Sequence, residues 1–254
     1  MRIVLSLLAA ASAWAQPPAP APPPVVPQTA QISRLINDFG NAERYAADNR
    51  TVPPAAPGEN RVVFMGDSIT DGWSNNQQYR PSFFPGKPYI GRGISGQVTA
   101  QMLLRFYQDV VALKPKAVVI LAGTNDIGSN IGPVPLESTE TNLMAMSDLA
   151  RANGIKVILA ALTPVCDYHV GEGRGPRVPQ TQNRPPEKIL ALNRWIKDYT
   201  AKNHFVYLDY FSATIDDKGF FKADLTYDGL HPNLAGYQIM APLAEKAISQ
   251  ALGQ

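Results

Sequence analysis

The sequence predicts an α/β fold in which helices cover both faces of a parallel β-sheet. Short apolar segments of strand length alternate along the chain with longer segments in which apolar residues recur at helical spacing. Strands that alternate with helices imply right-handed crossovers, and such crossovers make the strands parallel. The chain has 254 residues, of which 45% are hydrophobic and 17% charged, and this favours one globular domain with a sizeable core.

The individual elements follow from two kinds of pattern. Short apolar runs predict buried strands at 61–65, 116–121, 155–162 and 205–208, and a shorter one at 88–92. Helical periodicity predicts helices at 98–113, 136–153, 186–203 and 233–252. Ligands of parallel sheets bind beyond the carboxyl ends of the strands, so functional residues are expected directly after each strand.

The N-terminal residues predict export from the cytoplasm, to the periplasm or the medium. Arg2 precedes an apolar run that closes with Ala13 and Ala15, which is typical of a cleaved signal peptide. A retained membrane anchor is the alternative, although the run is short for spanning a bilayer. A Pro- and Ala-rich spacer and a helical segment, with apolar residues at helical spacing, follow. The predicted organisation is a signal peptide (1–15), a linker (16–28), an N-terminal helical extension (29–58) and the main domain (59–254).

Charge and metal-ligand patterns exclude several classes of protein. A net charge of +2 is too small for the basic surface that nucleic-acid binding needs. The single cysteine, Cys166, allows no intramolecular disulfide, and as a nucleophile it would have only His169 nearby as a base. Neither a histidine pair at helical spacing nor a cysteine cluster occurs, so we predict no metal and no other cofactor.

Four polar motifs follow predicted strands or lie near the C-terminus. They are Gly66-Asp67-Ser68-Ile69-Thr70, Gly93-Ile94-Ser95-Gly96, Gly123-Thr124-Asn125-Asp126 and Asp228-Gly229-Leu230-His231-Pro232-Asn233. A serine hydroxyl becomes a nucleophile when an imidazole takes its proton and a carboxylate holds that imidazole. Of the three histidines, His204 follows a predicted helix as a cap and His169 lies in a Gly- and Pro-rich loop. His231 is therefore the candidate base; alternatively, its motif is a plain turn before a helix cap.

In this order, the four motifs resemble the signature of the SGNH hydrolase superfamily, also called GDSL-like lipases and acylhydrolases. The resemblance covers about residue 61 to the end, the SGNH hydrolase domain. It implies a three-layer α/β/α sandwich of flavodoxin type, with a five-stranded sheet in the order 2-1-3-4-5. It also implies Ser68 as nucleophile, Asp228 and His231 as its catalytic partners, and Ser68, Gly96 and Asn125 as donors of the oxyanion hole. The chain is most similar in character to secreted bacterial esterases related to the platelet-activating-factor acetylhydrolase-like branch.

Other residues in these motifs or close to them have structural explanations. Asp67, Asp71 and Asp126 are predicted to hold local structure, and Trp73 to line a cleft or belong to the core.

The run from Gly91 to Gly96 fits the dinucleotide pattern G-x-G-x-x-G, but the acidic residue that would bind a ribose is missing. The G-x-S-x-G motif of the α/β-hydrolase fold is absent from the sequence.

The resemblance and the loop composition together predict an ester hydrolase that acts on a small-molecule or glycan ester. The segment 163–185 is rich in Gly, Pro and Arg and is a candidate substrate loop. It is polar and lacks an amphipathic lid helix, which favours a short acyl group on a polar alcohol such as an O-acetylated carbohydrate. The alternatives are a lysophospholipase or short-chain lipid esterase, and a non-catalytic carbohydrate- or nucleotide-binding module. We expect no nucleic-acid partner and no stable membrane insertion after signal removal. The sequence leaves the oligomeric state open.

Overall fold

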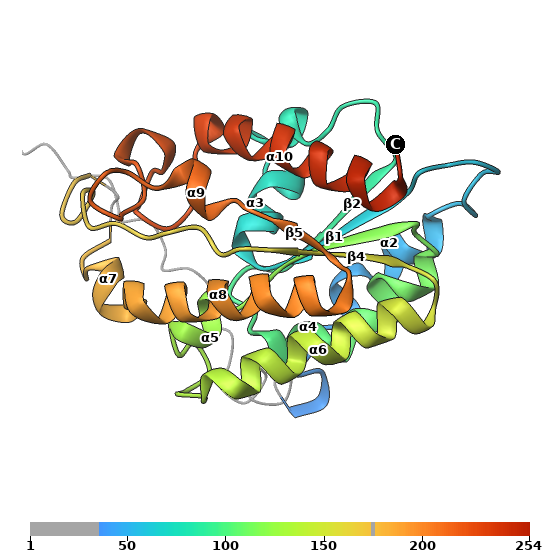
Figure 1. The fold of residues 1–254 in the computed structure, drawn as a ribbon, viewed down its shortest axis with the longest axis horizontal. Helices are drawn as coiled ribbons and strands as arrows, with labels where there is room; N and C mark the ends of the chain where they lie inside the picture. The colour runs from blue at the N-terminus through green and yellow to red at the C-terminus, as the bar shows by residue number, and fades with distance from the viewer. Residues whose placement is uncertain (1–35, 174–175) are drawn as a thin grey trace, which may run out of the picture. The chain divides into compact units, whose positions relative to one another are not determined.

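Five parallel strands form one sheet in the order β2-β1-β3-β4-β5, the order that the resemblance implied (Figure 1). The computed structural model describes residues 36–173 and 176–254, so the predicted signal peptide and linker lie outside the described residues. The strands are β1 (Val62–Gly66), β2 (Tyr89–Gly93), β3 (Ala117–Leu121), β4 (Lys156–Ala160) and β5 (Val206–Leu208). Each agrees with a predicted strand to within one or two residues at each end.

Helices cover both faces of the sheet. Helices α3 (Ser68–Asn75) and α10 (Leu234–Leu252) lie on one face, and α4 (Thr99–Asp109), α6 (Leu136–Ala152) and α8 (Pro186–Asn203) lie on the other (Figure 1). The shorter elements are α2 (Glu43–Thr51), α5 (Thr124–Ile127), α7 (Gln180–Asn183), α9 (Phe211–Thr214), η1 (Arg80–Ser82), η2 (Val111–Leu113) and η3 (Ala223–Leu225). All of these elements belong to one compact unit, residues 38–254.

Two elements differ from the prediction. The helix expected over 98–113 is the α-helix α4 followed by the 3₁₀ turn η2, after which Lys114 adopts a left-handed conformation ahead of a proline. Helix α3 was not predicted, because in eight residues it turns only Ile69, Trp73 and two small polar side chains inward. Two large apolar residues are too few to establish a helical period and so to distinguish a helix from a loop.

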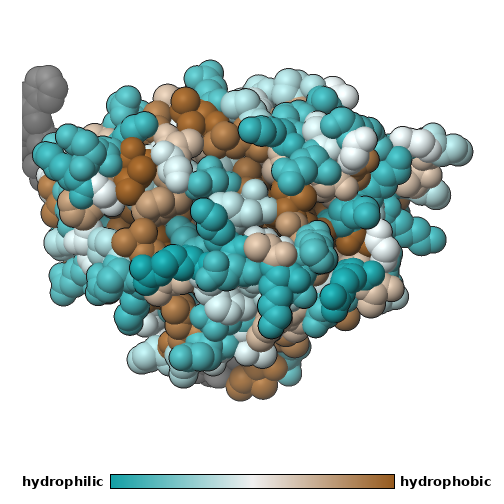
Figure 2. All heavy atoms as spheres, viewed as in Figure 1, coloured by the Kyte–Doolittle hydropathy of each residue, from teal (hydrophilic) through white to brown (hydrophobic). Residues whose placement is uncertain are grey.

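One face of this unit is mainly polar. The face shown in Figure 2 carries mostly hydrophilic side chains, with apolar residues in small groups between them. Within residues 36–173 and 176–254, no helix is both long enough and apolar enough to cross a lipid bilayer.

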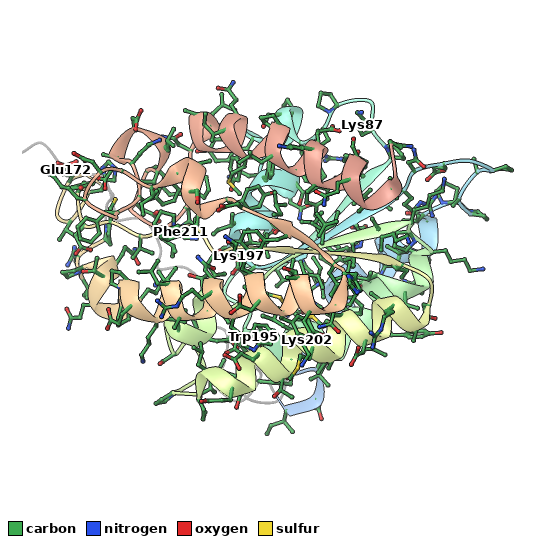
Figure 3. All side chains as sticks on the ribbon, viewed as in Figure 1. Lys87, Glu172, Trp195, Lys197, Lys202 and Phe211 are labelled. Atoms are coloured by element: carbon green, nitrogen blue, oxygen red, sulfur yellow. The ribbon has the colours of Figure 1, made fainter. Side chains whose placement is uncertain are left out.

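The core lies on both faces of the sheet. Every residue of β1 and of β3 is buried, as expected for central strands that are covered on both sides. Trp73 is 2% exposed and stacks on Tyr237, with ring centroids 5.0 Å apart, so it belongs to the core rather than to a cleft wall. On the other face, the half-buried Trp195 extends from α8 toward α6 and packs against the core (Figure 3).

The described part of the predicted N-terminal extension contains helix α2. Phe39 lies in a turn just before it, and the helix ends at Thr51, ahead of the two prolines. The hydroxyl of Tyr45 donates to the carbonyl oxygen of Gly93 at the end of β2 and accepts from Asn75 of α3 at 2.7 Å. Helix α2 is therefore joined to the edge strand and to the helix that follows β1.

Candidate active site

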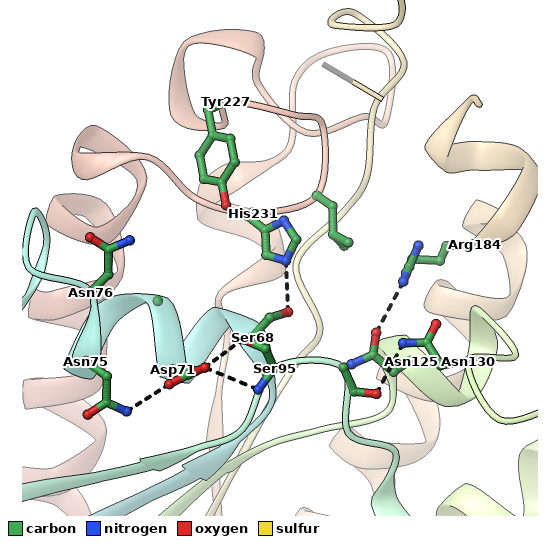
Figure 4. A pocket seen from close by; sticks show the side chains of 13 residues that line it. Ser68, Asp71, Asn75, Asn76, Ser95, Asn125, Asn130, Arg184, Tyr227 and His231 are labelled. Atoms are coloured by element: carbon green, nitrogen blue, oxygen red, sulfur yellow. Dashed lines mark hydrogen bonds between the residues drawn. The ribbon is translucent and has the colours of Figure 1, made fainter. Parts of the chain in front are cut away.

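A pocket of about 610 Å³ opens at the carboxyl ends of the strands, where the sequence places the four motifs (Figure 4). It brings together residues from α3, from the loop after β2, from α5, and from the loops before α8 and α10. Among the described residues it is lined by Ser68, Asp71, Gly72, Asn75, Asn76, Ser95, Gly96, Asn125, Asn130, Arg184, Tyr227, Leu230 and His231.

Ser68 is the first residue of α3, and only Asp67 separates it from the end of β1. Asp67 caps the helix, because its Oδ1 accepts a hydrogen bond from the backbone N–H of Ile69 at 2.9 Å. The N–H of a first helical residue has no partner inside the helix. Ser68 therefore offers both its hydroxyl and its N–H at the same point of the pocket.

His231 joins Ser68 to Asp228 by two short hydrogen bonds. Its Nε2 lies 2.8 Å from Ser68 Oγ (Figure 4), and its Nδ1 lies 2.7 Å from Asp228 Oδ2. Asp228 Oδ1 also accepts the backbone N–H groups of Leu230 and His231. Burial alone would raise the pKa of Asp228, but these hydrogen bonds and the imidazole charge hold its pKa below the usual value.

This arrangement fixes which ring nitrogen of His231 carries the proton. An ionised carboxylate only accepts hydrogen bonds, so the Nδ1 of His231 donates to Asp228. In a neutral imidazole the other nitrogen, Nε2, then accepts the hydroxyl proton of Ser68. The ring of Tyr227 stacks on the imidazole at a centroid distance of 5.7 Å and an interplanar angle of 11°.

The turn between Asp228 and His231 requires a glycine. Gly229 has a φ of +83°, and a Cβ there would lie 2.1 Å from the carbonyl oxygen of Cys166. Its N–H donates to Thr226 Oγ1 at 3.0 Å, and the same hydroxyl donates to the carbonyl of His231 at 2.7 Å. The Asp-Gly turn is thus held against the loop after β4, which aligns the carboxylate with the ring.

The candidate oxyanion donors line the pocket beside Ser68. Gly96 follows β2 in a left-handed conformation, with a φ of +80°. Asn125 lies on α5, four residues after the end of β3, and only 2% of it is exposed. Its Nδ2 donates to the carbonyl of Gln97 at 3.0 Å, and its Oδ1 accepts from Arg184 Nη2 at 3.2 Å (Figure 4).

Two acidic residues hold the loops around the pocket, as predicted. Asp126 accepts hydrogen bonds from the backbone N–H and the hydroxyl of Thr99, which ties α5 to the start of α4. Asp71 lies three residues after Ser68 and accepts the N–H and the hydroxyl of Ser95 at 3.3 and 2.6 Å. Helix α3 therefore fixes the position of the loop that carries Gly96.

Asp67 adds a buried carboxylate beneath the nucleophile. It is 1% exposed, and its Oδ2 has no hydrogen-bond partner in the described part of the chain. Burial raises the pKa of Asp67 to about 6, even though the N–H of Ile69 and the charges of His231 and Arg184 favour the ionised form.

The other candidate residues lie elsewhere. His169 Nε2 lies 3.0 Å from the carbonyl oxygen of Ala223, outside the pocket lining, and His204 is the C-cap of α8, as predicted. Cys166 is buried, and burial raises the pKa of its thiol. In the G-x-G-x-x-G run, Gly93 allows close packing, because a Cβ there would lie 2.2 Å from the backbone nitrogen of Asp71. Residues 36–173 and 176–254 contain no group of three His, Cys, Asp or Glu placed to hold a metal ion.

The structure adds pocket residues that the sequence analysis did not assign. Tyr227, Asn75, Asn76 and Asn130 line the cavity, and Arg184, expected only as part of a substrate loop, contacts Asn125. Helical spacing could have identified one pocket residue. Residues three and four apart share a helix face, so recognising α3 would have placed Asp71 next to Ser68. Asn130 and Arg184 lie on irregular segments, for which no such periodicity exists.

The chain is similar to known proteins in sequence and in fold. The profile of the GDSL-like Lipase/Acylhydrolase family matches residues 64–239. A putative acylhydrolase of known structure from Bacteroides fragilis is 40% identical and has a TM-score of 0.75, over 85% of this chain and 99% of that one. An acetylxylan esterase from Geobacillus stearothermophilus is 25% identical in an alignment of 205 positions, and the match covers 71% of this chain and 90% of that protein.

A further match is shorter. An uncharacterized lipoprotein of Bacillus subtilis, YqeF, is 36% identical over 81 residues, which are 31% of this chain and 33% of that protein. The family profile covers more than half of the chain, and the fold and the order of its strands are those that the four motifs implied. The chain therefore belongs to the GDSL-like lipase/acylhydrolase family, and it is a carboxylic ester hydrolase.

Proposed function

We propose that this hydrolase removes a short acyl group, acetyl above all, from a polar alcohol such as a carbohydrate. Ser68 is the nucleophile, His231 the general base and acid, and Asp228 the carboxylate that orients the imidazole. The observation that carries the proposal is the pair of hydrogen bonds, 2.8 and 2.7 Å long, that links Ser68 to His231 and His231 to Asp228.

In the first half of the reaction, Ser68 Oγ attacks the ester carbonyl carbon while its proton passes to His231 Nε2. The imidazolium that forms is stabilised by ionised Asp228, whose pKa lies below its usual value. The carbonyl oxygen becomes negative and receives hydrogen bonds from the N–H groups of Ser68 and Gly96 and from the Asn125 amide. When the intermediate collapses, the C–O bond to the alcohol breaks and His231 gives its proton to the departing oxygen.

In the second half, water hydrolyses the acyl-enzyme. His231 Nε2 takes a proton from the water as its oxygen attacks the acyl carbon, and the same donors stabilise the second tetrahedral intermediate. The bond between the acyl carbon and Ser68 Oγ then breaks, and His231 returns the proton to Ser68. The acid leaves and the resting state is restored, so no metal or redox group is needed.

The chemistry of the pocket favours a short acyl group and a polar alcohol. Asparagine, serine, aspartate and arginine side chains dominate its lining, and Leu230 is the one aliphatic side chain that contributes among the described residues. A long acyl chain needs an extended apolar surface to leave water. A sugar, in contrast, matches the amides of Asn75 and Asn76 and the half-exposed ring of Tyr227. The acetylxylan esterase relative supports the same class of substrate.

The proposal includes export. Residues 1–15 form a cleaved signal peptide, 16–28 a linker and 29–58 a helical extension to the hydrolase domain, 59–254. N-terminal sequencing of the protein from the medium or the periplasm should therefore give a chain that begins near Gln16. A chain that begins at Met1 outside the cytoplasm would contradict cleavage, and a membrane-bound product would indicate a retained anchor.

A substrate series on the purified mature protein tests the proposed activity. We expect kcat/KM for p-nitrophenyl esters to be highest for acetate and to fall by about 10² or more by octanoate, since the polar lining gives a long acyl chain little apolar surface to bind. Acetylated xylo-oligosaccharides should release acetate, and lysophospholipids should release no fatty acid. Ser68→Ala is the matched control and should be inactive on every substrate.

Two outcomes would contradict the proposal. A maximum at octanoate, together with lysophospholipid hydrolysis, would identify a lipid esterase instead. Failure to hydrolyse any ester and failure to react with a fluorophosphonate would indicate a non-catalytic binding module.

A further inference from the structure

Arg184 is a buried cation at the wall of the pocket. It follows α7, and its exposed fraction is only 8% although it lines the cavity. Its Nη1 donates to Gln180 Oε1 at 3.1 Å and its Nη2 to Asn125 Oδ1 at 3.2 Å, whereas its Nε has no hydrogen-bond partner in the described ranges. Its guanidinium lies against Gly128, where a Cβ would be 3.0 Å from Arg184 Cζ.

The bond from Arg184 determines which way the Asn125 amide points. A guanidinium has only donors, so the atom of the amide that faces it is the oxygen. The nitrogen then lies on the other side, where one of its N–H bonds goes to the carbonyl of Gln97 and the other remains for a partner in the pocket. If the amide were turned by 180°, its oxygen would face the Gln97 carbonyl and the developing oxyanion, and both contacts are repulsive.

The positive charge of Arg184 also favours hydrogen-bond donation by the Asn125 amide. Burial lowers the pKa of Arg184 and the charges of Asp67 and Asp228 raise it, but arginine stays protonated in proteins. A fixed positive charge that polarises the Asn125 amide makes its N–H a stronger donor. Such stabilisation is largest when the substrate oxygen carries its charge, in the transition state.

We propose that Arg184 is a positioning residue of the oxyanion hole, which orients the Asn125 amide and strengthens it as a donor. The proposal rests on the function proposed for Ser68 and its partners. It also gives the segment 163–185 a role: the segment ends by placing a cation behind the oxyanion hole. Gly128 is part of the same device, because it leaves space for the guanidinium beside α5.

Steady-state kinetics of Arg184→Met test the inference, with the enzyme concentration taken from fluorophosphonate titration of Ser68. We expect kcat on p-nitrophenyl acetate to fall by about 10 to 10², less than the loss on removing an oxyanion donor itself, with little change in KM. The double variant Arg184→Met/Asn125→Ala should have nearly the same kcat as Asn125→Ala alone, because Arg184 acts through Asn125. Arg177→Ala, an exposed arginine on the same segment, is the control and should keep the parent kcat.

Three further variants keep the test decisive if Arg184→Met folds poorly. Arg184→Lys retains the charge but not the fork of donors, so its kcat should lie between those of the parent and Arg184→Met. Gly128→Ala retains the arginine side chain, but the new Cβ displaces its guanidinium by a few tenths of an ångström. This variant should therefore have a lower kcat and an unchanged KM. Added guanidinium ion should restore part of the kcat of Arg184→Ala.

Three results would overturn the inference. They are an unchanged kcat in Arg184→Met, a rise in KM alone, and losses in Arg184→Met and Asn125→Ala that multiply in the double variant. A rise in KM alone would make Arg184 a substrate anchor. If Ser68→Ala were fully active, the proposed function itself would fail, and this result is distinguishable because it does not involve Arg184.

Discussion

The Nε2 atom of His231 lies 2.8 Å from the Oγ atom of Ser68, although 163 positions of sequence separate the two residues. Ser68 starts the helix after β1, and His231 lies on the loop that leads to α10. The parallel sheet brings both to its carboxyl edge, so the pair is a product of the topology rather than of local sequence. This contact is the reason for testing the variants Ser68→Ala and His231→Ala.

Ser68→Ala and His231→Ala should each lower kcat by about 10⁴ to 10⁶, and the double variant should be hardly slower than either. Nucleophile and base act as one unit, so removing the second member takes away little that is left. Ester hydrolysis measured in each variant, with circular dichroism to confirm the fold, checks this. Losses that multiply would show that one of the two residues lies outside the catalytic unit.

Asn125→Ala should lower kcat by about 10² to 10³ with a much smaller change in KM. The Asn125 amide is proposed to bind a charge that exists only in the transition state and its neighbouring intermediates. A fluorophosphonate, which carries its own leaving group, should still label Ser68 in this variant, but more slowly than in the parent. A change in KM alone, or in thermal stability alone, would mean that the amide binds substrate or holds the loop.

Asp67→Asn should become more stable relative to the parent as the pH rises from 4 to 7. Burial raises the pKa of Asp67 to about 6, from the ordinary value of 3.8 for an aspartate. A group whose folded pKa is raised stabilises the fold below its unfolded pKa, and this contribution is lost as the pH rises through the folded pKa. The two pKa values correspond to about 3 kcal/mol, an upper value for the change. Asparagine keeps the acceptor that caps α3.

Urea unfolding of both proteins at pH 4, 5, 6 and 7 measures this difference. The exposed Asp217→Asn is a control for the change in net charge and should follow the parent. A difference in the free energy of unfolding that does not vary with pH would contradict the account of Asp67.

Gly229→Ala should destabilise the protein more than Gly219→Ala does. Both glycines have a positive φ, of 83° and 88°, so alanine is strained at both positions by about 1 to 2 kcal/mol. Only at Gly229 would the new Cβ also meet backbone, 2.1 Å from the carbonyl oxygen of Cys166, whereas nothing lies within 4 Å at Gly219. Gly229→Ala should also lose activity, because the clash displaces Asp228 from His231. Equal melting temperatures and equal activity in the two variants would show that the turn tolerates a side chain.

The strands were predictable because their burial is continuous. β1 and β3 are buried at every position, which produces the apolar runs that identify them in the sequence. Helix α8 begins and ends where its pattern predicts, because its first residue is Pro186 and it ends at the left-handed cap His204. Helix α3 was missed because eight residues, with Gly72 among them, give no usable periodicity.

The site was predictable only in part for a related reason. Ser68, Gly96, Asn125 and His231 lie in short motifs at strand ends or next to a helix cap, where a parallel sheet collects functional residues. The contact of Arg184 with Asn125 joins positions 59 apart through an irregular segment. Such a contact depends on the path of a loop, which no periodic pattern encodes.

Covalent labelling of the purified parent protein with a fluorophosphonate, followed by peptide mass mapping, tests the central claim most directly. One adduct should form per chain, on Ser68, with loss of ester hydrolysis in proportion to labelling. Ser68→Ala should take up no label, and His231→Ala should react far more slowly, since the base that activates the hydroxyl is gone. An adduct on any other residue that abolishes activity, or full hydrolysis by a protein that is not labelled, would contradict the assignment of Ser68 as the nucleophile.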